Sequence, residues 1–289
     1  MKPRAGFAGM GVMGRPMAQN AAKAGFEVTV YNRTTPVPKD FPGLSIAADP
    51  LELARKNDIL VVMVTGPEAV DALLWGEKGM AAALAPGKTL INMSTVSPAY
   101  TAQLAKKVLA TGCAFADAPV SGSKLAAESA GLVILAGGAK ETVTAMEPLF
   151  SCLGKKTVYC GEVPGGTQMK LSVNLFLCAV MTGMAEMLTF AKKGGLSLET
   201  VLDVVLNGPL ACDFLRMKAP IIAKGGFDAA QFAAKHMAKD LKLIVDTACD
   251  MRCPAPSAFA NLQLYNQALS KGMGEQDLAA VVKVLESML

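Results

Sequence analysis

The chain has 289 residues, of which 18% are charged and 52% hydrophobic, so it is long enough for one large or two smaller globular domains and has no composition typical of disorder. Its net charge of +4 is too weak and too dispersed to indicate a nucleic-acid partner or a membrane surface. Seven widely spaced cysteines and a single histidine, His236, form no metal-ligand pattern. With no signal peptide expected, they favour a reducing, cytoplasmic compartment.

The first half of the chain alternates strand-like and helix-like segments. The expected strands, in chain order, are residues 4–8, 27–31, 58–64, 89–92, 114–117 and 132–136. The third is an almost unbroken apolar run, as expected of a parallel strand that is covered on both faces. This alternation predicts an α/β Rossmann-type domain built on a doubly wound parallel sheet.

The pattern changes at a segment rich in Gly and Pro, residues 161–166. No strand is expected after it. A long helix is predicted from about residue 167 to 192, and breaks at 207–209 and 225–226 separate further helices. The most apolar part of the long helix contains Asn174 and Glu186, which favours a buried helix over a membrane span.

These elements indicate two domains. We expect an NADP-binding Rossmann domain in residues 1–164 and an all-helical substrate and oligomerisation domain in 165–289, with residues 165–192 as the connecting helix. The active site is expected in the cleft between the two domains.

A glycine-rich turn follows the first expected strand and opens a helix, with the sequence Gly9-Met10-Gly11-Val12-Met13-Gly14. In this context the G-x-G-x-x-G spacing is typical of a dinucleotide-binding loop. Gly9 permits a tight turn, Gly11 lets the backbone approach the pyrophosphate, and Gly14 allows close packing of helix on strand. A tight turn without a ligand is the alternative.

The second expected strand is followed by Asn32, Arg33 and Thr34. An NAD-dependent enzyme would usually have Asp or Glu there to hold the ribose 2′-hydroxyl. Arg33 can instead pair with a 2′-phosphate, and Thr34 can donate a hydrogen bond to it. The segment therefore favours NADP, although Arg33 could be an ordinary surface charge.

Four blocks in this order resemble the β-hydroxyacid dehydrogenase family, which includes 3-hydroxyisobutyrate dehydrogenases and glyoxylate/succinic semialdehyde reductases. They are residues 9–14, the Asp-Ala-Pro-Val-Ser-Gly of 117–122, the Gly-Gly-Thr-Gln-Met-Lys of 165–170 with Asn174, and 232–241, which contains Phe232 and Lys239-Asp240-Leu241. Ser123 is more similar to the second of these branches, from which Leu125 departs.

The resemblance implies that Lys170 is the general acid and base of the reaction, with Asn174 four residues later on the same helix face. A lysine in an apolar cleft has a lowered pKa, which suits proton exchange near neutrality. A solvent-exposed lysine is the commoner fate of such a residue by sequence alone. By the same resemblance, Ser121, Gly122 and Ser123 bind the substrate carboxylate; without it they would be an ordinary turn.

The resemblance also places Thr95 between nicotinamide and substrate, and Met63, Val64 and Thr65 along the cofactor. Lys239 should lie near the cofactor, while Phe232 and Asp240 line the substrate pocket. Asp240 could pair with Lys170 or orient it, or Lys239 and Asp240 could simply be neighbours on a solvated helix face.

We therefore expect an NADPH-dependent reductase of a small aldehyde or keto acid, without a metal, that forms a dimer or tetramer by burying helix faces. Three alternatives remain: a 3-hydroxyisobutyrate-type dehydrogenase, an imine reductase on the same scaffold, and a dinucleotide-binding protein without catalysis.

Overall fold

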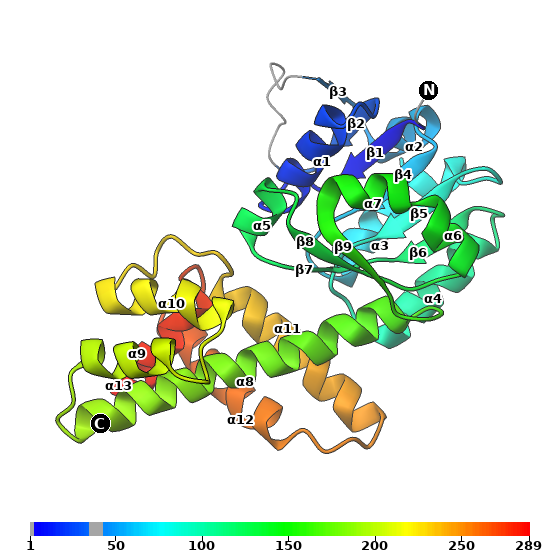
Figure 1. Ribbon diagram of the computed structural model, residues 1–289. Helices are drawn as coiled ribbons and strands as arrows, with labels where there is room; N and C mark the ends of the chain where they lie inside the picture. Colours follow the sequence, from blue (N-terminus) through cyan, green and yellow to red (C-terminus); the bar gives the residue numbers. More distant parts are fainter. Residues whose placement is uncertain (1–2, 35–42) are drawn as a thin grey trace. The chain divides into compact units, whose positions relative to one another are not determined.

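The computed structural model describes residues 3–34 and 43–289. The chain divides into two compact units, Met1–Lys170 and Leu171–Leu289, which are described separately (Figure 1). This division falls one turn inside the long helix, rather than at its start, where the sequence places the domain boundary.

The first unit is built on a six-stranded sheet with the order β3-β2-β1-β4-β5-β6, in which every neighbouring pair is parallel. Its strands are β1 (Ala5–Ala8), β2 (Val28–Tyr31), β3 (Leu44–Ile46), β4 (Ile59–Val62), β5 (Thr89–Asn92) and β6 (Ala114–Asp117). The strand order reverses direction beside β1, which pairs with both β2 and β4. This architecture confirms the Rossmann-type prediction, and five of the six strands were expected.

The segment Leu132–Ala136 was expected to extend the parallel series, and this expectation is wrong. It forms β8 of a separate three-stranded sheet, between β7 (Val120–Ser121) and β9 (Gly154–Tyr159). The chain reverses after β6, so that β7 pairs with β8 in antiparallel fashion and an isolated antiparallel bridge joins Asp117 to Gly137. A two-residue strand such as β7 is too short to leave a pattern in the sequence.

Helices cover these sheets: α1 (Gly14–Lys23), α2 (Pro50–Lys56), α3 (Pro67–Trp75), α4 (Pro98–Leu109), α5 (Lys124–Glu128), α6 (Lys140–Ala145) and α7 (Glu147–Leu153), with a 3-10 helix η1 (Met80–Ala83). Local chemistry fixes several of their starts. Asp49 and Ser97 precede a proline and cap α2 and α4, accepting hydrogen bonds from Glu52 N at 2.8 Å and Tyr100 N at 3.2 Å.

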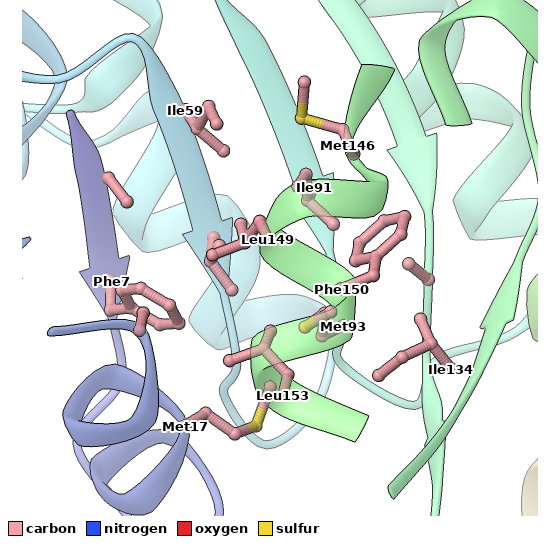
Figure 2. Packing of buried hydrophobic residues seen from close by; sticks show 14 of the residues in the cluster. Phe7, Met17, Ile59, Ile91, Met93, Ile134, Met146, Leu149, Phe150 and Leu153 are labelled. Atoms are coloured by element: carbon pink, nitrogen blue, oxygen red, sulfur yellow. The ribbon is translucent and has the colours of Figure 1, made fainter. Parts of the chain in front are cut away.

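One core of the first unit lies between the large sheet and α7. Figure 2 shows Leu149, Phe150 and Leu153 of α7 lying against Phe7 and Ile91 of the sheet. Burying side chains of this size stabilises the fold by about 1.5–3 kcal/mol each, so this face of the sheet is held rigidly. The edge at which the strands end is thereby fixed for the loops that follow it.

The second unit is helical in the described residues. It contains α9 (Leu198–Asn207), α10 (Asp213–Lys224), α11 (Ala234–Asp250), α12 (Pro256–Ser270), the 3-10 helix η2 (Leu278–Ala280) and α13 (Val281–Glu286), together with most of α8 (Gly165–Lys193). Every named strand in the described residues precedes Cys160. The prediction of a helical second half joined through one long helix is confirmed.

A buried ion pair fixes the connection after α10. Lys218 Nζ lies 2.8 Å from both carboxylate oxygens of Asp277, with side-chain exposures of 2% and 0%. Asp277 also accepts hydrogen bonds from the backbone N–H groups of Gln231 at 2.9 Å and Ala279 at 3.0 Å. With its charge paired and its oxygens bonded, this carboxylate is tolerated inside the core.

Among the described helices, α8 alone is long and apolar enough to cross a membrane by length and composition, with a mean hydropathy of 1.6 in its most apolar 18-residue window. Core helices of soluble proteins have the same property. Of this window, 44% is buried within the structure, and Cys178, Met181 and Ala185 are fully enclosed in the core of the helical unit.

Candidate functional site

The parallel sheet of the first unit brings five loops to one edge. Since all six strands point the same way, the loops that leave their carboxyl ends meet there, which is where open α/β sheets bind ligands. The loops after β1, β2, β4, β5 and β6 contain every residue that the sequence assigns to the cofactor or substrate within this unit apart from Lys170. These are residues 9–14, 32–34, 63–65, 95 and 121–123.

The loop after β1 has the geometry of a dinucleotide site. Gly9 has φ +99°, and a Cβ there would collide with the Met63 carbonyl oxygen, so packing within the protein requires this glycine. A Cβ at Gly11 would meet no atom within 4 Å. Packing within the described structure therefore leaves the backbone at Gly11 open, which is compatible with the predicted approach of a pyrophosphate.

Asn32 ties the loop after β2 to the glycine-rich loop. Its Oδ1 accepts a hydrogen bond from Met10 N at 3.0 Å, which fixes the backbone of the glycine turn relative to the end of β2. Arg33 and Thr34 follow in exposed positions. No carboxylate stands at residues 31–34. This edge of the sheet therefore lacks the acidic residue that NAD-dependent enzymes usually have at this position.

The loops after β4 and β5 are joined by Ser94, which the sequence did not single out. Its hydroxyl accepts a hydrogen bond from Val64 N at 3.0 Å and lies 3.4 Å from the Val62 carbonyl oxygen. The predicted residues Met63, Val64 and Thr95 are half-buried beside it, and Thr65 is exposed. Ser94 therefore holds the two predicted segments in a fixed relation.

The predicted carboxylate-binding loop continues from β6 along β8. Ser121 is half-buried and pairs with Val133 in the antiparallel ladder. Gly122 has φ +142°, a backbone conformation that L side chains rarely adopt, and a Cβ there would lie 2.8 Å from Leu132 Cδ2, so the local fold already favours glycine. Ser123 stands at the N-cap of α5 and makes no capping hydrogen bond through its side chain.

Lys170 lies on the first turns of α8 and belongs to the same compact unit as Ser121. Its side chain is half-buried rather than fully exposed. One turn earlier, Thr167 is fully buried and bonds to Asp117, the last residue of β6. Asp117 and Thr167 belong to sequence motifs of the family resemblance, but the sequence predicts no role for either residue.

In the helical unit, Asn174 and Asp240 form a buried pair. Asn174 Nδ2 donates a hydrogen bond of 2.7 Å to Asp240 Oδ2, and the two residues are 1% and 3% exposed. Lys239 Nζ lies 2.8 Å from the other carboxylate oxygen, with its own side chain 29% exposed. Asp240 is therefore not on a solvated helix face, and its partners within this unit are Asn174 and Lys239.

Phe232 lies beside the only histidine of the chain. The Phe232 and His236 rings stack with centroids 6.4 Å apart and an interplanar angle of 9°. Burial lowers the pKa of His236, and the charges of Lys235 and Lys239 lower it further. His236 is thus neutral at pH 7 and contributes ring surface rather than charge beside Phe232.

Within residues 3–34 and 43–289, no group of three His, Cys, Asp or Glu side chains could hold a metal ion. The predicted residues instead form two sets: a nucleotide-type edge with Ser121 and Lys170 in the first unit, and the Asn174, Asp240 and Lys239 group with Phe232 in the second.

Two family models cover nearly the whole chain. Residues 4–161 match the NAD binding domain of 6-phosphogluconate dehydrogenase, and residues 165–285 match the NAD-binding domain of NADP-dependent 3-hydroxyisobutyrate dehydrogenase. The junction between the two models coincides with the start of α8.

The chain is also similar to characterised relatives over almost its full length. It is 35% identical to glyoxylate/succinic semialdehyde reductase 2, chloroplastic, of Arabidopsis thaliana, over 98% of this chain and 79% of that one. It is 34% identical to glyoxylate/succinic semialdehyde reductase 1 of the same plant, over 97% and 98%. A crystal structure of 3-hydroxyisobutyrate dehydrogenase from Salmonella typhimurium superimposes with a TM-score of 0.87 at 26% identity, covering 98% of this chain and 100% of that one.

Proposed function

The chain belongs to the β-hydroxyacid dehydrogenase family, whose enzymes act on CH–OH groups with a nicotinamide dinucleotide, and on that premise we propose that it reduces small aldehyde or keto acids with NADPH. Glyoxylate and succinic semialdehyde are the proposed substrates, as in the two plant relatives. Lys170 is the proposed general acid. The observation that carries the proposal is that Ser121 and Lys170 lie in one compact unit and are both connected to the end of β6.

The proposed nucleotide site is the edge after β1, β2 and β4. Residues 9–14 would receive the pyrophosphate at the N-terminus of α1, where backbone N–H groups and the helix dipole favour an anion. Arg33 and Thr34 are exposed beside the loop that Asn32 holds, and they would bind a 2′-phosphate. Bound NADPH would supply the hydride.

The proposed carboxylate site consists of Ser121, Gly122 and Ser123. Ser121 is held by pairing with β8, and Ser123 has a hydroxyl that helix capping does not use. A substrate whose acid group binds there is oriented at one end, which places its carbonyl for reaction. Thr95 would lie beside the reacting carbon.

Lys170 would donate the proton that the carbonyl oxygen takes up during reduction. It is half-buried on the first turns of α8, and an ammonium group is a proton donor of the kind that general acid catalysis uses. Asn174 follows one turn later on the same helix. Because Asp240 accepts from Asn174, the Asn174 amide group is fixed and its oxygen can face a proton donor or substrate hydroxyl.

The test is turnover with NADPH and a pair of aldehydes matched in length. Succinic semialdehyde should exceed butyraldehyde by at least about 10²-fold in kcat/KM, because only the first can use the carboxylate site. Ser121→Ala should narrow this gap by weakening the acid substrate, and Lys170→Ala should remove most turnover while NADPH still binds. Equal activity on both aldehydes would contradict the carboxylate site. Oxidation of 3-hydroxyisobutyrate in preference to these acids would favour the related dehydrogenase activity.

We also propose that the enzyme is a cytoplasmic homo-oligomer without nucleic-acid or membrane partners. The seven free cysteines suit a reducing compartment, and the dispersed charge suits a small anionic substrate. The buried residues of α8 support a core helix over a membrane span. Exposed phenylalanines on the same helix support self-association.

A further inference from the structure

Asp117 is a buried carboxylate that the proposed chemistry does not use. The residue has no exposed surface, lies at the end of β6 and faces the start of α8. Its Oδ2 accepts a hydrogen bond from Thr167 N at 2.7 Å, and its Oδ1 accepts one from Thr167 Oγ1, also at 2.7 Å. A buried charge without such partners would be strongly destabilising, so both bonds are needed where it stands.

The backbone on either side of Asp117 is equally fixed. Asp117 N donates to the Gly137 carbonyl at 2.9 Å, and Gly137 N donates back to the Asp117 carbonyl at 2.7 Å. Two residues later, the Pro119 carbonyl accepts a hydrogen bond from Leu135 N at 2.9 Å. Backbone hydrogen bonds thus hold the segment from Asp117 to Ser121 against β8. The position of Ser121 is therefore fixed relative to Asp117.

The start of α8 is packed against the same point without room for a side chain. A Cβ at Gly166 would collide with the carbonyl oxygens of both Asp117 and Leu135, so the helix backbone is in direct contact with β6 and β8. Thr167 follows Gly166, and Lys170 lies one helical turn beyond Thr167. The direction in which α8 leaves the sheet, and with it the place of Lys170, therefore depends on this contact.

We propose that Asp117 and Thr167 are positioning residues that join the Ser121 loop and the first turn of α8 into one rigid part, so that the substrate carboxylate and the Lys170 amine keep a fixed separation. The inference rests on the proposed function for the roles of Ser121 and Lys170. Displacing a reacting group by about 1 Å can cost about 10²-fold in rate, so a pair of hydrogen bonds behind the site can matter as much as a residue in it.

Thr167 and Thr101 provide a matched pair for the test. Their hydroxyls are 3.0 Å apart and both residues are fully buried, but only Thr167 bonds to Asp117. Thr167→Val keeps the side-chain shape and removes the hydroxyl that donates a hydrogen bond to Asp117. Thr101→Val makes the same change at the neighbouring hydroxyl, which does not bond to Asp117. Thr167→Ser keeps a hydroxyl that can donate to Asp117.

With NADPH and succinic semialdehyde, we expect Thr167→Val to lower kcat about 10-fold with the KM for NADPH unchanged, and Thr167→Ser to recover most of the loss. Thr101→Val should stay within about twofold of wild type. Both valine variants lose a buried hydroxyl, so both can lower the melting temperature, but only a positioning role separates them in kcat. Equal losses in the two valine variants, or no loss in Thr167→Val, would overturn the inference.

Hydrogen exchange of the whole 289-residue chain gives a readout that does not depend on the substrate. Amides 167–170 should exchange at least about 10-fold faster in Thr167→Val than in Thr101→Val, while amides of β1 and β4 stay protected in both. If the wild-type enzyme reduces no oxo acid, the proposed function fails and this comparison alone decides whether Asp117 and Thr167 hold the helix. Equal exchange in the two variants would contradict that role.

Discussion

At the scale of single residues, Arg33 decides the proposed choice of cofactor. It is exposed at the end of β2, where Asn32 fixes the backbone to the glycine-rich loop. Arg33→Asp should reverse the preference from NADPH towards NADH, because it removes a cation for the 2′-phosphate and adds a carboxylate for the 2′-hydroxyl. The measurement is the ratio of kcat/KM for the two cofactors. Arg4→Asp, which replaces another exposed arginine of the same unit, should leave that ratio unchanged, and equal ratios in wild type and Arg33→Asp would contradict the role of Arg33.

The Asp117 carboxylate, proposed above to position the site, should also lower the free energy of unfolding when it is charged. Burial raises its pKa to about 6, against the hydrogen bonds from Thr167 and Gly166, which favour the charged form. Between the usual Asp pKa of about 3.9 and a pH of about 6, the folded protein keeps a proton that the unfolded chain has released. The stability that this proton gives is present below that range and is lost as the pH rises through 6.

We therefore expect the difference in unfolding free energy between wild type and Asp117→Asn to change by about 2 kcal/mol between pH 4 and 7, with wild type losing relative stability as the pH rises. Denaturant unfolding at several pH values measures this difference. Subtracting the variant removes the contribution of His236, which has a lowered pKa and is common to both proteins. A pH-independent difference would show that Asp117 does not titrate in this range.

At the scale of elements, the sequence predicted what periodicity and composition determine. The long helix was expected at about 167–192 and is Gly165–Lys193, and the fully buried strand β4 was recognised from its apolar run. The strand β9 was missed because its side chains are mostly exposed or half-buried, including Lys155 and Lys156, so it has neither an apolar run nor a clean alternation. The strand β3 has only three residues, none of them buried.

Partners that are far apart in the sequence could not be predicted in the same way. Asn174 and Asp240 are 66 residues apart, and Asp117 and Thr167 are 50 apart, so no local spacing reveals either bond. The resemblance to the family marked Asn174 and Asp240 as site residues but left the partner of Asp240 open. The role of Asp117 could not be predicted for a second reason. It depends on close backbone packing at Gly166, which only the folded structure shows.

The Asn174–Asp240 bond should also matter for the stability of the helical unit, because it joins α8 to α11 inside the core. Asn174→Ala leaves a carboxylate oxygen without its buried donor and should lower the free energy of unfolding by about 1–3 kcal/mol. Asn207→Ala is the matched control. Asn207 bonds to Asp203 on the surface of α9, so its loss should cost less than about 0.5 kcal/mol. Urea unfolding of both variants measures the difference, and equal losses would show that the buried bond has no special weight.

At the scale of the whole molecule, α8 exposes a face that suits a second copy of the chain. Phe176 is 72% and Phe190 84% exposed, and Gly183, also exposed, lies midway between them. The three residues are seven apart, so they lie nearly on one line of the helix. If two copies of α8 cross in antiparallel fashion at Gly183, Phe176 of each copy meets Phe190 of the other, which is the self-complementarity that a twofold interface requires.

Gly183 supports this arrangement, because a Cβ there would meet nothing within 4 Å in the described chain, although glycine inside a helix costs about 1 kcal/mol relative to alanine. Close approach of a helix from a second copy would explain a glycine at position 183. Phenylalanines at interfaces bury about 150–250 Å² each, so the four at such a crossing would supply a large share of the roughly 1,600 Å² of a standard interface.

We therefore expect the wild-type protein to be at least a dimer by light scattering, and Phe190→Asp to shift it to a smaller assembly, since the substitution places a charge in the apolar contact between Phe190 of one copy and Phe176 of the other. Leu109→Asp is the control: Leu109 is 55% exposed on α4 of the first unit, outside the proposed interface, and the same change there should leave the mass unaltered. A monomeric wild type, or an assembly that Phe190→Asp leaves intact, would contradict the α8 interface. Loss of assembly in both variants would show instead that any added charge disrupts it.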